Sequence, residues 1–477
     1  MKPNVRMTDI TMKNFKNVRH GKLSLMNYRK DFRASVVGIY GQNGSGKTAL
    51  IDALELLKFA LSGLEIPKRF ADYIHVGSEY AEIEYTFDVT IEEETYMVIY
   101  LLSLKKEEID DVGNLNESKE ETEYRIRVCH EILKSEIRAK NGKFRMGKIM
   151  DTDATDVFVP KSKYTLLIGS SREDELNLMV SKKVSQKMSR SFLFSKELLN
   201  KIRSHFVQQS EEVGANVELS HYLALLEALV RFGNRELFVI NTIHSGMISL
   251  DAQPLIFRLK RENKGFFGSI ALPMSESALI PEDVYRIEVE VIENMNTVLN
   301  QLVPGLTIGI KSLGQQLMES GEVGVKTELV SKKNDKEIPL KYESEGIKKI
   351  VSILQLLIVV YNQPSITVAI DEFDSGIFEY LLGELIRIIS VRGKGQLIFT
   401  SHNLRPLETI DRGFIAFTTT NPNNRYIRMV NVKENNNLRD FYYRDITLGE
   451  QDEEVYESTN NEKIAFAFRE AGEYLGS

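Results

Sequence analysis

Short apolar runs of strand length alternate in this chain with segments of helical periodicity. The runs at residues 35–40, 366–370 and 396–400 are apolar or β-branched and read as buried strands. Residues 49–54 and 350–360 are apolar at helical spacing and predict buried helices. This alternation of strands and helices predicts an α/β protein.

Other segments have a different pattern. Strict alternation at residues 80–89 and 94–100 predicts antiparallel strands, and the acidic, polar residues 105–121 predict an exposed loop. Residues 196–232 have helical spacing. Further strands are expected at residues 156–159, 164–168, 327–330 and 337–340, the last two joined by a hairpin turn at 332–336.

Composition limits the class of protein. A chain of 477 residues is too long for one core, and 27% charged with 42% hydrophobic residues is the balance of a soluble globular protein. The longest apolar stretch, residues 350–361, is too short to span a bilayer, and no signal peptide is recognised. Cys129 is the only cysteine, so no internal disulfide or cysteine metal cluster can form. We therefore expect a cytoplasmic protein without a membrane partner.

The charge balance bears on nucleic-acid binding. A net charge of -7 and a pI near 5.8 argue against a protein that coats DNA over its whole surface. Binding to DNA through a local basic cluster stays open, although such clusters are more often solvated faces. The candidates are Lys182, Lys183, Lys187 and Arg190 near Phe192 and Phe194, and Arg258, Lys260, Arg261 and Lys264 beside Phe266.

A glycine-rich loop lies between the strand at residues 35–40 and the helix that follows. Its residues are Gly41, Gln42, Asn43, Gly44, Ser45, Gly46, Lys47 and Thr48. Glycines let backbone N–H groups close around a phosphate, and the helix N-terminus adds partial positive charge. In a loop of this pattern Lys47 binds the β- and γ-phosphates, and the Thr48 hydroxyl is a magnesium ligand.

Two later strands end in candidate catalytic groups. Asp371 and Glu372 follow residues 366–370, where such a pair can hold magnesium through water and polarise the attacking water. An Asp-Glu pair alone is a weak signal, and a lone histidine is more often structural. His402 stands at the end of the next buried strand. This arrangement favours a catalytic role for the Asp-Glu pair and for the histidine.

A serine and a glycine open the helical run at residues 350–360. Ser344 is read either as an ordinary N-cap or, together with Gly346, as part of an anion site at a helix start.

Together these residues resemble the ABC-class AAA ATPases related to RecF and the SMC proteins. The resemblance is closer to the bacterial branch of phage-defence proteins, which includes the ATPases of OLD-family nucleases and the RloA, AbiL and Septu-type proteins. It covers about the first hundred residues and about residues 307–415. It implies a P-loop ABC-type head, with a mixed sheet and flanking helices, that carries a mixed α+β insertion.

The resemblance also assigns roles. Gly41 to Thr48 would be Walker A, Asp371 and Glu372 Walker B, Ser344 to Gly346 the signature, and His402 the switch histidine. The opening strand at residues 7–17 is similar as well. The signature departs from the Leu-Ser-Gly-Gly-Gln of transporters, Ile377 and Phe378 stand where the D-loop usually has Leu-Asp or Leu-His, and no Q-loop glutamine is assigned.

The implied organisation is a head split by an insertion: residues 1–104 and 284–440 form the head, 105–283 the insertion and 441–477 a tail. The implied activity is ATP hydrolysis with Mg²⁺, by a homodimer or higher even oligomer whose heads enclose ATP. We expect a sensor of an anti-phage system with a separate nuclease or toxin effector, and the alternative is a RecF-like repair ATPase on DNA ends or gaps. No nuclease motif is recognised, and the segment after His402 is too short for a Toprim domain.

Overall fold

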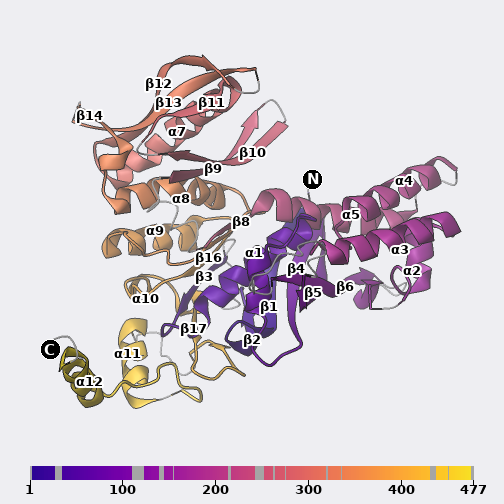
Figure 1. Ribbon diagram of the computed structural model, residues 1–477, viewed down its shortest axis with the longest axis horizontal. Coiled ribbons are helices and arrows are strands. Elements are labelled where there is room, and N and C mark those ends of the chain that lie inside the picture. Colours follow the sequence, from indigo (N-terminus) through magenta and orange to yellow (C-terminus); the bar gives the residue numbers. More distant parts are fainter. Residues whose placement is uncertain are drawn as a thin grey trace, which may run out of the picture.

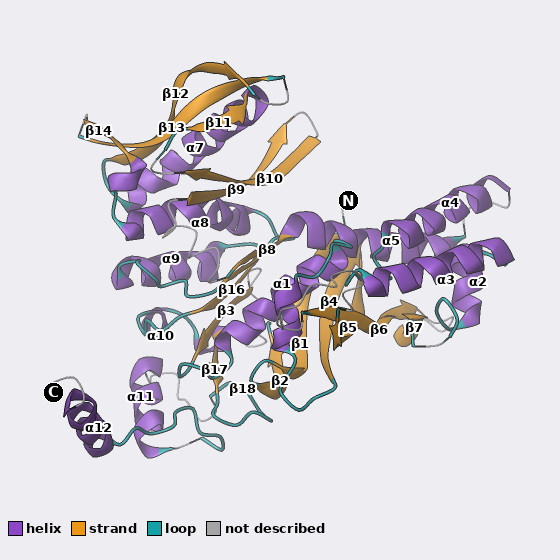
Figure 2. Ribbon diagram, in the orientation of Figure 1, coloured by secondary structure: helices purple, strands orange, loops and turns teal. Residues whose placement is uncertain are grey.

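Two six-stranded sheets with one helix between them organise the fold, which is α/β (Figures 1 and 2). Further helices flank both sheets. The computed structural model describes residues 3–26, 35–109, 123–138, 144–153, 155–212, 216–241, 252–261, 264–273, 276–318, 321–334, 336–429, 437–449 and 451–473.

The first sheet is almost wholly parallel and has the order β18-β17-β3-β16-β15-β8. β18 alone is antiparallel to its neighbour. The carboxyl ends of β3, β15 and β16 therefore meet at one edge, as ligand sites of open α/β sheets require. Its strands are β3 (Ser35–Tyr40), β8 (Leu237–Ile240), β15 (Thr367–Ile370), β16 (Gln396–Thr400), β17 (Ile415–Thr418) and β18 (Tyr426–Ile427).

The second sheet is antiparallel and has the order β2-β1-β4-β5-β6-β7. The predicted strands at 80–89 and 94–100 are confirmed. Residues 105–108 of the predicted loop instead continue β5, and residues 110–122 lie outside the described part. The expected head boundary at residue 104 thus falls within a strand. The strands are β1 (Asn4–Phe15), β2 (Val18–Ser24), β4 (Tyr80–Ile91), β5 (Glu94–Glu108), β6 (Tyr124–Arg138) and β7 (Phe144–Asp151).

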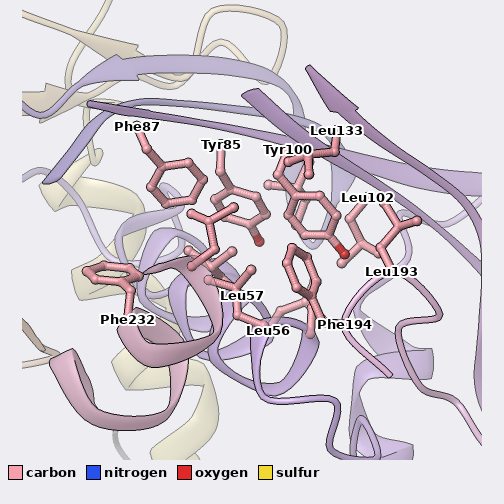
Figure 3. Packing of buried hydrophobic residues seen from close by; sticks show 14 of the residues in the cluster. Leu56, Leu57, Tyr85, Phe87, Tyr100, Leu102, Leu133, Leu193, Phe194 and Phe232 are labelled. Atoms are coloured by element: carbon pink, nitrogen blue, oxygen red, sulfur yellow. The ribbon is translucent and has the colours of Figure 1, made fainter. Parts of the chain in front are cut away.

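Helix α1 (Lys47–Leu61) lies between the two sheets. Most of its side chains are buried, because one face packs on the parallel sheet and the other on β1, β4 and β5. Its apolar sequence suits a helix buried all round. Figure 3 shows Leu56 and Leu57 against Tyr85, Tyr100 and other side chains of this core, and the Tyr85 hydroxyl donates to the Ala53 carbonyl at 2.7 Å.

The other face of the parallel sheet is covered by α8 (Glu345–Asn362) and α9 (Glu379–Arg392) (Figure 1). Strand β3 shows why both faces must be covered. Val37 and Ile39 belong to the α1 core, whereas Val36 and Tyr40 belong to the core under α8 and α9. Successive side chains of a strand point to opposite faces, so an apolar run needs cover on both.

Helices α2 (Lys161–Ile168), α3 (Arg172–Lys187), α4 (Lys196–Glu212) and α5 (Val217–Arg231) extend beside the antiparallel sheet. The helical structure predicted at 196–232 is confirmed in the described residues, but the prediction of a strand at 164–168 is wrong. Tyr164, Leu167 and Ile168 have helical i, i+3, i+4 spacing, and Pro160, which suits a helix start, precedes α2. The strand predicted at 156–159 is also wrong, because only an isolated bridge joins Val159 to Asp151.

A further layer packs over α8, and it contains α7 and the sheet of β11 to β14 (Figure 1). The predicted hairpin is confirmed, since β13 and β14 pair antiparallel around residue 334. No helix in the described part of the chain combines the length and apolar character needed to cross a bilayer. The remaining elements are β9 (Ala252–Arg261), β10 (Lys264–Pro273), β11 (Ala278–Pro281), α7 (Glu282–Leu302), β12 (Leu306–Leu317), β13 (Val323–Lys333), β14 (Lys336–Pro339), α10 (Pro406–Thr409), α11 (Leu438–Leu448), α12 (Asn461–Glu473) and the short helical turns η1 (Lys68–Tyr73), η2 (Phe232–Glu236), η3 (Leu340–Tyr342) and η4 (Arg412–Phe414).

Candidate nucleotide-binding site

The glycine-rich loop connects β3 to α1 at the carboxyl edge of the parallel sheet. Gly46 is the N-cap of α1 with φ of 98°, in the left-handed region that favours glycine. A Cβ at Gly41 would lie 1.8 Å from Thr418 Oγ1, so only glycine fits there. The loop is thus bent around its glycines, and the α1 N-terminus points its free N–H groups at the loop.

Residues near the carboxyl end of the chain hold this loop. The Thr418 hydroxyl donates to Ser45 Oγ and lies 3.2 Å from the Tyr40 carbonyl oxygen. The Tyr426 hydroxyl donates to the Gly46 carbonyl at 2.7 Å. Ser45 also donates to the Gln42 carbonyl at 2.6 Å, so its hydroxyl supports the loop from within.

The Lys47 ammonium lies over the loop that precedes it. Nζ donates to the carbonyls of Gly41 at 2.8 Å and Gln42 at 3.0 Å. Burial lowers the Lys47 pKa, and the negative charge of Asp371 opposes this. A partly buried ammonium inside a ring of backbone N–H groups is suited to a phosphate.

One cavity of about 430 Å³ brings the predicted groups together. Its lining joins four segments that are far apart in sequence: the end of β1, the glycine-rich loop, the end of β15 and the end of β16. Of the predicted site residues, Gly41, Gln42, Ser45, Ser344 and Gly346 do not line it. The lining residues are Lys16, Asn17, Asn43, Gly44, Gly46, Lys47, Thr48, Ala49, Asp371, Glu372, Thr400 and His402.

Thr400 fixes the acidic pair and was not predicted. Its hydroxyl donates to Asp371 Oδ1 at 2.5 Å and accepts from the Glu372 N–H at 2.8 Å. Glu372 has φ of 47°, a conformation that costs a non-glycine residue energy and persists only where its surroundings enforce it. The two strands were predicted from the sequence, and pairing them in parallel places Thr400 beside Asp371. The contact between Thr400 and the acidic pair could therefore have been predicted.

The loop after Glu372 is joined to the His402 segment. Asp374 Oδ2 accepts from the backbone N–H groups of His402 at 3.1 Å and Asn403 at 2.9 Å. The Phe373 N–H donates to the Thr400 carbonyl at 3.0 Å. His402 therefore reaches the cavity from a segment that the Asp374 carboxylate ties to the acidic pair.

Lys16 and Asn17 line the cavity from the end of β1, and neither was predicted as a site residue. The Lys16 ammonium pairs with the Asp52 carboxylate and lies 3.9 Å from the centre of the Tyr73 ring. The Asn17 side chain donates to the Gly44 carbonyl. No local pattern marks these residues, because Arg425, 408 residues away, holds the Asn17 carbonyl at 2.7 Å.

The donor set suits a magnesium ion. Thr48 and Asp371 line the same cavity with a hydroxyl and a carboxylate, and Mg²⁺ prefers oxygen ligands. Asp371 Oδ2 is buried without a hydrogen-bond partner among the described residues, as expected of an oxygen that faces a cation or its water. Within the described residues no cluster of three or more histidine, cysteine or acidic side chains could hold a metal by itself. Mg²⁺ usually keeps waters and takes phosphate oxygens as further ligands, so two protein groups suffice.

The predicted signature lies at the start of α8, away from this cavity. Ser344 is the N-cap of α8, and its hydroxyl accepts from the Ile347 N–H at 3.4 Å. Ser344 is exposed. The structure thus confirms that Ser344 is the N-cap of α8. Because Ser344 is exposed, an anion or a second subunit can still reach the start of this helix.

One member of the first basic cluster is not available to nucleic acid, whereas Lys183 and Lys187 are exposed. Lys182 is only 7% exposed, and its ammonium donates to the carbonyls of Thr152 at 2.7 Å and Asp156 at 2.9 Å. Phe192 and Phe194 are buried in the α1 core. The side chains of the second cluster, Arg258, Lys260, Arg261, Lys264 and Phe266, lie outside the part that the structure describes.

A family profile described as "AAA domain, putative AbiEii toxin, Type IV TA system" matches residues 36–408. The chain belongs to this AAA family. The match runs from β3 to α10 and so includes the loop, the acidic pair and His402. A search of curated protein sequences found no match for this AAA protein.

Solved structures similar to this AAA protein include heads of SMC proteins and a RecF. The SMC head domain from Thermotoga maritima is 15% identical, with a TM-score of 0.37 over 89% of this chain and 99% of that one. The Smc head from Pyrococcus furiosus bound to the C-terminal domain of ScpA is 13% identical, with a TM-score of 0.38 over 89% and 96%. The recombination mediator RecF is 14% identical, with a TM-score of 0.35 over 88% and 98%. At these scores the likenesses carry no argument about function.

Proposed function

We propose that this AAA protein binds ATP with Mg²⁺ and hydrolyses it. One observation carries the proposal: a single cavity joins Lys47 and Thr48 of the glycine-rich loop to Asp371, Glu372 and His402. A phosphate-binding loop beside two carboxylates is the arrangement that phosphoryl transfer to water requires.

Each group has a role that its position supports. The loop N–H groups and Lys47 bind the β- and γ-phosphates, and Thr48 and Asp371 hold the magnesium ion. When bound, Mg²⁺ neutralises charge on the phosphates as the terminal bond breaks. Glu372 orients and polarises the attacking water, and His402 contacts the terminal phosphate from the end of β16.

We further propose that two copies close head to head around two ATP molecules. Ser344 and Gly346 do not reach the cavity of their own chain, and Ser344 is exposed at a helix N-terminus. Such a helix start can bind the γ-phosphate held by a second subunit. A higher even oligomer can be built from the same contact.

The biological role that we favour is a sensor of an anti-phage system that acts with a separate nuclease or toxin. Closure of the heads is a two-state element that ATP can bias, and it can hold or release such an effector. The family description names a toxin–antitoxin system, which supports this role over a RecF-like repair ATPase. Lys182, a member of one of the two candidate basic clusters, is buried and so adds nothing to a DNA-binding surface.

The test of the ATPase is the Glu372→Gln variant beside Lys47→Ala. Glu372→Gln keeps every proposed phosphate and metal contact, so it binds ATP as the wild type does and accumulates as a closed dimer, while turnover falls at least about 100-fold. Lys47→Ala loses nucleotide binding itself. Turnover close to wild type in Glu372→Gln would show that the assignment is wrong.

The effector is tested by copurification from the native operon, which is expected to recover a second protein whose activity changes in the Glu372→Gln background. The purified chain alone is expected neither to cut DNA nor to protect cells from phage. Asp445 is buried and accepts from the Gln451 N–H at 3.0 Å, which indicates a structural carboxylate. A magnesium-dependent nuclease activity that persists in the single chain and is lost on mutation of Asp440 or Asp445 would overturn the separate-effector proposal.

A further inference from the structure

Helix α3 carries a row of exposed apolar side chains. Leu176 is 60% exposed, Val180 62%, Val184 47% and Met188 43%, and each follows the previous one by four residues. Side chains four residues apart form the ridge along which helices most often pack against each other. Single exposed apolar residues are ordinary, whereas a continuous row of them marks an interaction surface.

The opposite face of α3 is anchored, so the row is held in one orientation. Leu178 packs in the α1 core, and Lys182 donates from the same face to two backbone carbonyls. Lys201 of α4 pairs with Asp174, near the start of α3, at 2.6 Å. Helix α3 lies among the helices beside the antiparallel sheet, away from the loop between β3 and α1 (Figure 1). The row is therefore separate from the nucleotide site.

Charged residues on this face are arranged symmetrically about Val180. Glu173 lies seven residues before Val180, and Lys187 lies seven residues after it. Both charged side chains are exposed, and neither is paired within the described part of the chain. Leu176 and Val184 lie four residues to either side of Val180. A two-fold rotation about an axis at Val180 therefore brings the acidic end of the face to the basic end of a second copy, and apolar side chains to apolar side chains.

We propose that two copies of this chain pair antiparallel through α3, with the two-fold axis at Val180. In this isologous contact Leu176 packs against Val184 of the partner subunit, and Glu173 lies opposite Lys187 of the partner subunit. The contact is distinct from the proposed closure of the heads and does not depend on ATP. Where the heads also close around ATP, the two contacts together build an even oligomer larger than a dimer.

The contact is expected to be weak. Helix α3 has 16 residues and is about 24 Å long, so a pair of these helices buries less than about 1,200 Å², at the low end of interface sizes. We therefore expect a dissociation constant in the micromolar range, and a single subunit at concentrations below it.

Sedimentation of the nucleotide-free chain, over a concentration series that extends well above the micromolar range, tests the contact. The wild type dimerises, and Lys47→Ala dimerises equally because the heads are not involved. In Val180→Glu two introduced carboxylates meet on the axis, and the dissociation constant rises at least about 100-fold. The matched control is Val217→Glu, which dimerises as the wild type does, because Val217 is an 83% exposed valine on α5. Urea midpoints stay unchanged in both glutamate variants, since both positions are exposed.

Charge reversal tests the antiparallel register. Glu173→Lys or Lys187→Glu alone places like charges opposite each other at both ends of the pair, and the dissociation constant rises about 3- to 30-fold. An equimolar mixture of the two variants restores opposite charges at both ends and recovers the wild-type affinity.

A wild type that stays monomeric throughout the series overturns the inference, as does a Val180→Glu variant that dimerises like the wild type. A mixture that associates no better than either charge variant alone refutes the antiparallel register. ATP turnover is not part of these measurements, so failure of the proposed ATPase would leave the α3 contact standing.

Discussion

Replacing Thr400 by valine removes one hydroxyl and leaves a side chain of nearly the same shape. Thr400 is 1% exposed, so water cannot replace the lost oxygen. The hydroxyl makes two hydrogen bonds, one to the Asp371 carboxylate and one from the Glu372 N–H. The variant therefore tests how far this residue supports the acidic pair.

The magnitude follows from the two bonds. Loss of the bond to a buried carboxylate costs roughly 1.5–3 kcal/mol, and an orphaned buried N–H costs roughly 1–3 kcal/mol. We expect Thr400→Val to lower the free energy of unfolding by about 2.5–6 kcal/mol. We also expect kcat to fall about 10- to 100-fold, because Glu372 is no longer held in its left-handed conformation.

Thr367→Val is the matched control. Thr367 is buried at the other end of β15 and donates to Gln396 Oε1 at 3.1 Å, an oxygen that also accepts from the Met7 N–H at 2.8 Å. Since that acceptor keeps a partner, the loss is about 0.5–1.5 kcal/mol with unchanged kcat. Urea midpoints and steady-state ATP turnover measure both effects. The reasoning fails if the two variants lose equal stability and Thr400→Val keeps wild-type turnover.

Ser344→Arg is expected to bind ATP as a single subunit but to show no nucleotide-driven association in sedimentation, and an ATP affinity as low as that of Lys47→Ala would rule out a contact in trans. Gly346→Ala places its Cβ 2.2 Å from the Gly376 carbonyl oxygen and is expected to lower the free energy of unfolding by about 1–3 kcal/mol, which an unchanged urea midpoint would contradict. Burial raises the Glu288 pKa to about 7, so stability should decline as pH rises from about 4.5 to 7, because the unfolded chain ionises this carboxyl first. Glu288→Gln is expected to be more stable than wild type at pH 8 by up to about 3 kcal/mol, and equal urea midpoints at pH 8 would refute this.

The sequence contained enough information to predict the segments whose signals are local. The strand–loop–helix around Lys47 has its glycines, its apolar strand and its helix within a few residues, and all three elements occur as expected. The ends of β15 and β16 were also predicted, because both are short buried runs followed by polar groups. Their meeting in one cavity with Lys47 supports the resemblance on which the roles were assigned.

The features that were missed depend on distant partners or on ambiguous patterns. Lys16 and Asn17 reach the cavity only because Arg425 holds the turn after β1. Lys182 looks like a surface lysine in sequence, but backbone carbonyls around residues 152–156 bind it in the interior. The segment 164–168 is so short that its apolar spacing is compatible with a strand or a helix. In the structure it forms part of α2, which packs against α4.

The position of β3 has a consequence for synthesis of the chain. Its two neighbours in the parallel sheet are β16 and β17, and β16 begins at Gln396, roughly 350 residues after β3 ends at Tyr40. At roughly 5–20 residues per second, this apolar strand waits on the order of 20–70 s on the ribosome before either neighbour exists. Both of its edges are unpaired during that time, and such edges aggregate or recruit chaperones. The nucleotide site can form only after β16 has been made, so ATP binding reports that synthesis has passed this strand.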